Sequence, residues 1–196
     1  VYAIVRRVID GRTVRYIERM STRGFETLEE SFFLDAGLTY SGAAADTITG
    51  LRHLEGKTVS VLADGYVLAP REVVGGEITL DRDATLVHVG LPYESDLQVL
   101  PAVLQNAEAG GITIMKNASV VYVQVRDTTG IFAGPDFDNL REALPDYSAI
   151  PSPLRTDTVE VPIDGEWTFD LRVCIRQSDP LPITVLSLGV EVHTPD

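Results

Sequence analysis

Short apolar runs alternate with polar residues along this chain, and turn residues separate them. At its start, two runs rich in Val, Ile and Tyr flank Asp10-Gly11 in "VYAIVRRVIDGRTVRYIERM". An Asp-Gly pair tolerates the positive φ angles of a two-residue turn, so the pattern predicts a β-hairpin. The simplest register places Arg6 opposite Arg15, an unfavourable pairing of like charges. We therefore expect either an acidic side chain between these arginines or a bulge that shifts the register.

From Leu38 onward, strand-like runs of about four to seven residues recur roughly every ten residues, which is typical of a small barrel or a sandwich. The segment "TITGLRHLEGKTVSVLADGYV" (47–67) shows the pattern and also holds a His, a Lys and two acids. We interpret these polar residues as punctuation between strands rather than as a reaction centre. Within it, Thr58 and Ser60 are expected on the wet face of a strand whose other face is apolar.

The second half of the sequence has the same character. Further strands are predicted at 96–104, 112–128, 157–163, 170–177 and 181–193. A long loop at about 129–156 carries four prolines, and a loop of that length is either functional or pinned against another surface. Inside it, "DFDNLREAL" predicts one or two helical turns beginning at Asp136 or Asp138.

One segment of the first half is ambiguous. Residues 26–35, "ETLEESFFLD", place Thr27 and Glu30 at the spacing of a capping box, and Leu28 and Phe32 share a helical face. A short helix and an irregular loop both fit this pattern. Taken together, the predicted elements indicate an all-β fold with few short helices.

Composition and charge narrow the possible classes of function. With 196 residues, 44% hydrophobic and 23% charged, the chain is long and apolar enough to bury a core. No apolar run approaches the roughly 18 residues of a membrane-spanning helix, so no span is expected. The net charge of −13 repels phosphate backbones and argues against nucleic-acid capture, although a negative wall would let DNA slide past. Because the chain begins at Val1 within a strand-like run, we expect it to be a piece of a longer protein.

Residue types that carry catalysis are present but scattered. His53, His88 and His193 have no metal-ligand spacing, and the single cysteine, Cys174, lies in the apolar stretch "LRVCIR". We interpret the histidines as structural or exposed and the cysteine as a buried apolar residue. The chain contains neither a Gly-x-Ser-x-Gly elbow nor a phosphate-binding glycine motif. We therefore predict no catalytic residue, no bound cofactor and no metal site.

Two acidic clusters and one aromatic residue were weighed as binding sites. Asp81 and Asp83, and separately Asp136 and Asp138, are the best candidates for oxygen ligands of a cation. Turn formation is the better interpretation of both clusters, because Asp readily bonds to nearby backbone in turns. Trp167, in "DGEWTFD", is either a core or edge anchor or a platform for a sugar.

Several blocks of the sequence resemble the C-terminal part of the tail nozzle proteins, also called tail tubular protein B, of short-tailed bacteriophages. The most specific blocks are "GLRHLEGKTVSVLADGYV" and "VCIRQSDPLPITVLSLGVEV". Others are "GGEITLDRDATLVHVGLPYESDLQVL", "VRDTTGIFAGPDFDNL", "PSPLRTDTVEVPIDGEWTFD", "VRRVIDGRTVRYIERM" and "FFLDAGLTYSG", so the likeness covers most of the chain.

The resemblance implies a fold and a role. It implies a β-sandwich-like body formed by 1–37 and 93–196, interrupted by a small β-barrel at 38–92. That barrel resembles the first catalytic-cysteine half-domain of ubiquitin-activating enzymes in fold only. The family assembles as six-fold rings that continue the DNA channel below the portal and adaptor, and it offers no catalytic residues to transfer.

These considerations lead to one expectation and two rivals. We expect a non-enzymatic virion protein of the tail, assembled in the host cytoplasm as a homo-oligomer that contacts the phage adaptor and other tail proteins. DNA would pass through its channel without specific binding. The first rival is a receptor- or glycan-binding module at a tail tip, which would use the 129–156 loop and Trp167. The second is a virion-borne glycosidase with two facing carboxylates.

Overall fold

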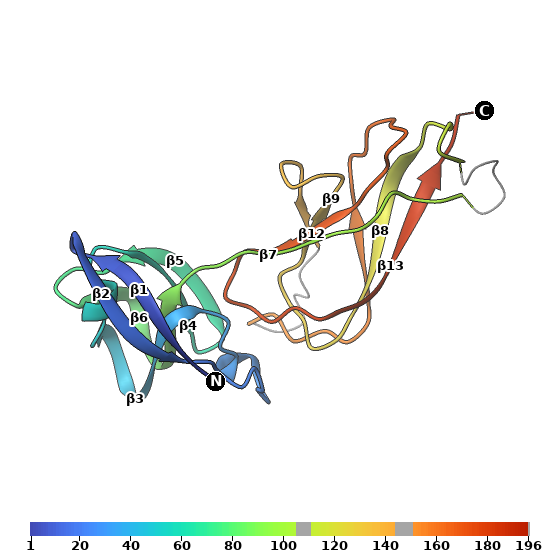
Figure 1. Cartoon of the computed structure of the whole chain (residues 1–196). Coiled ribbons are helices and arrows are strands. Elements are labelled where there is room, and N and C mark those ends of the chain that lie inside the picture. Colours follow the sequence, from blue (N-terminus) through green and yellow to red (C-terminus); the bar gives the residue numbers. More distant parts are fainter. Residues whose placement is uncertain (105–110, 144–150, 196) are drawn as a thin grey trace. The chain divides into compact units, whose positions relative to one another are not determined.

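The structure is a computed structural model that describes residues 1–104, 111–143 and 151–195. Among these residues the strands pair only in antiparallel fashion, in four sheets, and two short 3-10 helices accompany them. The predicted all-β fold class is therefore confirmed (Figure 1). The strands are β1 Tyr2–Ile9, β2 Arg12–Arg19, β3 Asp35–Thr49, β4 Thr58–Ala63, β5 Tyr66–Glu72, β6 Glu77–Leu91, β7 Ser95–Gln98, β8 Asn117–Val125, β9 Phe132–Gly134, β10 Arg141–Glu142, β11 Thr158–Pro162, β12 Cys174–Gln177 and β13 Val185–His193.

The contacts between residues divide the chain into two compact units. The first contains Val1–Tyr93 together with Asp179–Pro182, and the second contains Glu94–Ser178 together with Ile183–Asp196. This division differs from the one that the family resemblance implies, because residues 1–37 group with 38–92 rather than with the later strands. The reason lies in side-chain contacts such as that of Tyr16 in β2 with His53, whose rings meet edge to face at 6.2 Å.

The hairpin β1–β2 has the predicted turn and the simplest register. Asp10 and Gly11 both have positive φ angles, 47° and 69°, and Arg6 stands opposite Arg15 without a bulge. No ion pair reaches either arginine from the residues that the structure describes. Among the described residues, the hairpin thus has neither the intervening acidic side chain nor the register-shifting bulge that we expected. Both arginine side chains are exposed, so water and salt screen their repulsion.

The rest of the first unit is a four-stranded sheet in the order β3–β6–β4–β5. Register shifts in β3 and between Val59 and Val61 of β4 bend its strands around an apolar core. This core draws on β3, β4 and β6 and includes Ile48, Leu54 and Val87, none of them accessible to solvent. The predicted small barrel corresponds to this sheet, and no pairing between β3 and β5 closes it among the described residues.

Strand β4 corrects one expectation. It pairs with β5 on one side and β6 on the other, and every residue from 59 to 63 is buried. Ser60, expected on a wet face, is only 9% exposed. Polar and apolar residues alternate along β4, which predicted a strand with one exposed face. A central strand that is covered on both faces can nevertheless bury a small hydroxyl group.

The ambiguous segment 26–35 forms one 3-10 turn, Leu28–Glu30, rather than a longer helix. The side chain of Thr27 makes no capping bond to this turn. The carboxylate of Glu30 instead accepts the backbone N–H of Glu26 at 3.1 Å. Leu28 itself is buried, so packing holds the segment without the predicted capping box.

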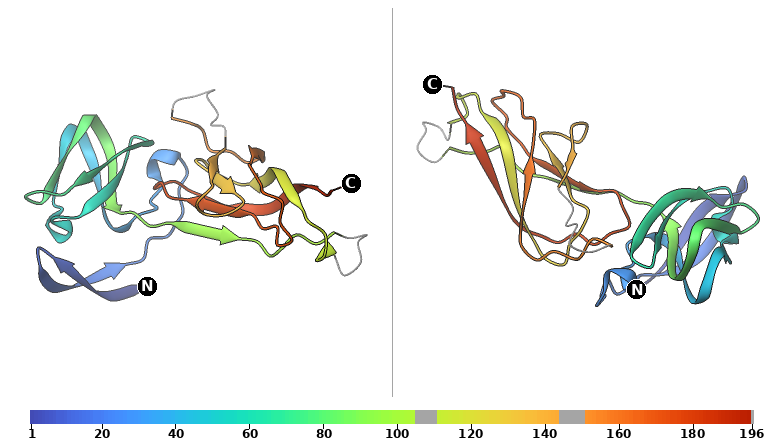
Figure 2. Two further views of the ribbon diagram at one scale, coloured as in Figure 1. Left: turned by 90° about the horizontal axis from the view of Figure 1, so that it is seen from above. Right: turned by 180° about the vertical axis from the view of Figure 1, so that it is seen from behind.

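The second unit contains two sheets with a shared core. One sheet has the order β10–β9–β12–β7 and the other the order β11–β8–β13. Alternate side chains from both sheets form one apolar cluster, which includes Val121, Val161, Ala133 and Ile175. Figure 2 shows this unit in two further views. Packing of two antiparallel sheets through their apolar faces is the arrangement of a β-sandwich.

The predicted strands of this unit are shorter than expected, and the long loop contains structure. β7 ends at Gln98, after which the N–H groups of Val99 and Ala102 still bond to carbonyls of the segment before β12. The predicted loop at 129–156 contains β9 and β10, while its residues 144–150 lie outside the described part. No helix begins at Asp136 or Asp138; this prediction is wrong, because Asp136 closes a local turn and β10 follows.

Candidate functional site

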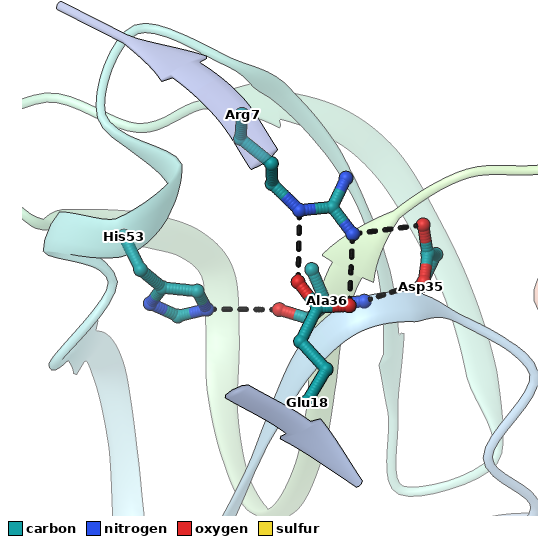
Figure 3. A network of polar contacts seen from close by, with 5 residues as sticks. All are labelled: Arg7, Glu18, Asp35, Ala36 and His53. Atoms are coloured by element: carbon teal, nitrogen blue, oxygen red, sulfur yellow. Dashed lines mark hydrogen bonds and ion pairs between the residues drawn. The ribbon is translucent and has the colours of Figure 1, made fainter. Parts of the chain in front are cut away.

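The polar residues of segment 47–67 bind backbone groups around the first unit's sheet. Glu55 accepts the N–H groups of Gly75 at 2.7 Å and Gly76 at 2.6 Å, which ties the loop before β6 to the loop before β4. Nε2 of His53 lies 2.8 Å from the carbonyl oxygen of Ala36, so this nitrogen carries the donated proton (Figure 3). These side chains tie two loops and the start of β3 together and do not converge on a common point.

Asp64 shows the same behaviour at the turn between β4 and β5. It has a positive φ of 48°, and its carboxylate accepts the N–H groups of Thr85 and Leu86 together with the Thr85 hydroxyl. Burial raises the pKa of Asp64, but the hydrogen bonds from Leu86 and Thr85 and the nearby Arg82 outweigh it, so the net shift is downward. The carboxylate thus stays ionised as a structural acceptor.

Arg7 is the centre of a polar network that joins the hairpin to β3 (Figure 3). Its guanidinium donates to both carboxylate oxygens of Glu18, at 2.9 and 3.0 Å, and to Asp35 at 3.1 Å. The hydrogen bond to Glu18 is the largest cause of a raised Arg7 pKa. The other oxygen of Asp35 accepts the N–H of Ala36, whose φ of 49° lies in the left-handed region. Bonds at both its N–H and its carbonyl hold Ala36 in that unusual conformation.

The three histidines are separated. His88 is buried in β6, where Nε2 donates to the carbonyl of Glu29 at 2.9 Å and Nδ1 accepts the Thr39 hydroxyl at 2.8 Å. Burial lowers the pKa of His88, so the ring is neutral, as both bonds require. His193 is exposed at the end of β13 and contacts the Ser119 hydroxyl at 2.8 Å. A shared catalytic or metal-binding role for them finds no support in this arrangement.

Cys174 is buried in β12, as its apolar surroundings predicted. Its Sγ accepts a hydrogen bond from the Gln98 amide at 3.3 Å. Burial raises the pKa of this thiol, which keeps it protonated and unreactive.

The acidic clusters are turn and surface features. Asp81 and Asp83 lie within strand β6, which runs without interruption from Glu77 to Leu91, so the predicted turn at this cluster is wrong. Asp81 pairs with Arg71, and Asp83 is exposed. Asp136 accepts the N–H groups of Asp138 and Asn139, at 2.8 and 2.9 Å, and its pKa is lowered chiefly by the Asn139 amide. Such bonds are those of an Asx turn, the interpretation preferred from sequence.

The described residues contain no cluster of side chains typical of a metal centre. Across 1–104, 111–143 and 151–195, no three His, Cys, Asp or Glu side chains gather in a way that would hold a metal ion. Among the carboxyl groups of this part with a resolved shift, Asp179 has a pKa raised by burial, whereas those of Asp64, Asp96 and Asp136 are lowered. No helix in the same part is long and apolar enough to cross a membrane.

Lys116 is a structural residue that no sequence pattern singles out. It is 1% exposed, and its Nζ donates to the carbonyls of Gly111 at 2.7 Å and Ile114 at 3.2 Å. A lysine in a polar stretch is normally placed in water. Only the local chain path, which turns two carbonyls toward the ammonium, explains its burial.

A cleft of about 490 Å³ lies beside the hairpin. It is lined by residues 6–9 of β1, by Lys57 and Thr58 at the start of β4, and by Leu91 and Pro92 at the end of β6. Of its cations, Arg7 is already bonded to two carboxylates, so Arg6 and Lys57 carry its positive charge. The lining residues include no carboxylate, histidine, cysteine or serine.

Trp167 and Phe169 form an exposed aromatic pair in the second unit. Thr168 between them exchanges two backbone hydrogen bonds with Lys116, at 2.7 and 2.9 Å. Trp167 and Phe169 are the residues immediately before and after this bridge in the chain. They are 46% and 55% exposed, so Trp167 is not a core anchor.

Comparison with known proteins leaves the function open. No family model matches the chain, and no curated protein matches it.

Proposed function

We propose that this protein is a structural component of a bacteriophage tail, part of the nozzle that encloses the DNA ejection channel. The observation that carries the proposal is the use of the polar residues in 47–67. His53, Glu55 and Asp64 bind backbone groups of the scaffold instead of facing a shared pocket. Side chains used in this way stiffen a protein that acts by shape.

Charge supports the same proposal. A net charge of −13 on two β units gives a surface that repels phosphate groups. At physiological salt this repulsion acts over about 8 Å, enough to keep a passing duplex from adhering to a channel wall. In this proposal the chain is not an enzyme. It forms a six-fold ring with copies of itself, contacts the adaptor and other tail proteins, and resides in the virion after assembly in the host cytoplasm.

The test is to locate the protein in particles. An antibody raised against this chain is expected to label the tail tip of virions, and the protein made from its complete gene should form six-fold rings in electron micrographs. Virions whose copy of the gene has been deleted are the control, and they should lack both the label and the nozzle. Infectious, tailed particles without the protein would contradict the proposal.

The exposed Trp167 favours a second candidate function, glycan binding at a tail tip. An aromatic side chain beside Phe169 and flanked by Glu166 and Asp170 offers a ring face and polar neighbours to a sugar. Because Trp167 is the single tryptophan, its fluorescence reports this site alone. If the candidate holds, titration with neutral bacterial surface oligosaccharides gives a saturable change that Phe169→Ala weakens about tenfold. An unchanged spectrum across the panel removes the candidate.

A further inference from the structure

One face of the hairpin β1–β2 is left uncovered by the described residues. In β1 the buried Ile9 marks the inner face, so the alternate residues point outward. We call this the outer hairpin face. The register pairs its residues across the two strands: Tyr2 with Arg19, Ile4 with Ile17, Arg6 with Arg15 and Val8 with Thr13.

The outer hairpin face is strongly apolar for an exposed surface. Ile4 and Ile17, which stand opposite each other, are each 76% exposed, and Tyr2 and Val8 are 72% and 55% exposed. A two-stranded hairpin is marginally stable by itself. Contiguous apolar patches on a surface mark sites of association, whereas single exposed apolar side chains do not.

The charge of this face is opposite to that of the chain. It carries Arg6, Arg15 and Arg19 and no acid, on a protein with a net charge of −13. An acidic partner surface is therefore available on every other copy of the same chain.

The surface that fits is the outer face of the sheet β11–β8–β13. Its other face supplies Val159, Val161, Val121, Val123 and Val190 to the core, so the alternate residues point outward. We call this outer side the acidic sheet face. It comprises Thr158, Glu160 and Pro162, Val120, Tyr122 and Gln124, and Ser187, Gly189 and Glu191. It holds two glutamates and neither lysine nor arginine, and Gly189 beside Tyr122 leaves it flat at its centre.

The distance between two arginines of the outer hairpin face matches the distance between the two glutamates of the acidic sheet face. Arg15 and Arg19 lie on one strand, about 13 Å apart at the rise of a β-strand. Glu160 and Glu191 lie on the two outer strands of their sheet. They are offset by two residues along the strand direction, because they pair with Tyr122 and Val120 of β8. That diagonal is about 12 Å at the strand spacing of a sheet. Each arginine can thus meet one glutamate.

We propose that the outer hairpin face of one copy packs face to face on the acidic sheet face of a second copy. Its apolar centre, Ile4 and Ile17, covers Tyr122 and Gly189, and its arginines pair with Glu160 and Glu191. Because the two surfaces differ, each copy keeps one free surface of each kind, and the contact propagates until a ring closes. The inference deepens the ring proposed above and rests on it for closure, whereas the contact itself rests on these two faces.

Charge reversal tests the contact. Sedimentation of the 196-residue chain from micromolar to millimolar concentration should show reversible self-association. Arg15→Glu and, separately, Glu160→Arg should each weaken it by about tenfold or more, because each places like charges together. The double variant R15E/E160R restores an opposite pair and should return the dissociation constant to within about threefold of the original.

Matched controls separate the contact from net charge. Arg52→Glu makes the same change of charge as R15E at an exposed position of the first unit outside the hairpin, and Asp46→Arg matches E160R in the same unit. Both should leave association within about twofold, and circular dichroism should show all variants folded. A chain that stays monomeric at millimolar concentration, an R15E no weaker than R52E, or a double variant that fails to recover would each overturn the proposal.

The outcome also separates this inference from the proposed function. If rings form from the complete gene product and neither R15E nor E160R affects them, the proposed contact is ruled out and the nozzle proposal stands. If both substitutions weaken association but the protein is absent from virions, the contact stands and the nozzle proposal is ruled out.

Discussion

Leu54→Ala is expected to lower the free energy of unfolding of the first unit by about 2–5 kcal/mol. Leu54 is inaccessible to solvent, although its neighbours His53 and Glu55 reach outward to backbone groups. It closes the apolar core on which β3, β4 and β6 pack. Truncation removes buried methyl groups and leaves a cavity, because the hydrogen bonds of its two neighbours fix the loop and prevent its collapse.

Native-state hydrogen exchange, followed by mass spectrometry on peptides of β4 and β6, measures this loss. Trp167 fluorescence is unsuitable for the first unit, since this residue lies in the second, but it serves as a separate record of the second unit. Val74→Ala is the control: its side chain also belongs to the first unit and is 66% exposed, so we expect a change below about 0.5 kcal/mol. Equal effects of L54A and V74A would show that the core of this unit is packed differently.

Gly90→Ala is expected to destabilise the same unit by about 2–3 kcal/mol for the opposite reason, overpacking. A Cβ at this position of β6 would lie 2.8 Å from the carbonyl oxygen of Asp35 and 2.9 Å from the Cα of Gly37. Both are backbone atoms, so no side-chain rotation relieves the clash. The displaced segment carries Asp35 and Ala36, which means that the network around Arg7 is disturbed as well.

Gly24→Ala is the matched control for Gly90→Ala. Gly24 has no atom within 4 Å of an added Cβ, and its φ is outside the positive region, so alanine should be neutral or slightly stabilising there. Thermal unfolding of both variants, combined with hydrogen exchange in the hairpin, gives the comparison. Faster exchange of hairpin amides in G90A alone would confirm that segment 34–37 links the hairpin to the sheet. A G90A chain as stable as G24A would contradict the close approach.

Sequence patterns correctly predicted the features that depend on residues close together in the chain. The Asp10-Gly11 turn and the pairing of Arg6 with Arg15 follow from the geometry of a two-residue hairpin, and the structure has both. The Asx turn at Asp136 is equally local, since its partners lie within three residues. Burial of Cys174 followed from the apolar run around it.

Features decided by distant neighbours were missed. Ser60 has the letters of a half-exposed strand, but β5 and β6 flank its strand and it is buried. The grouping of residues 1–37 depends on contacts such as that between Tyr16 and His53, which no periodicity reveals. Likewise, Glu55 and His53 were correctly interpreted as structural, yet their partners at Gly75, Gly76 and Ala36 came only from the tertiary fold.

The burial of Lys116 has a practical consequence for labelling. The chain has two lysines, and one of them is enclosed with its ammonium bonded to two carbonyls. Of these two lysine side chains, an amine-reactive dye therefore reaches Lys57. Thiol reagents leave the folded protein unmodified, because Cys174 is enclosed too. A fluorophore can thus be attached beside the cleft of the first unit without engineering a new residue.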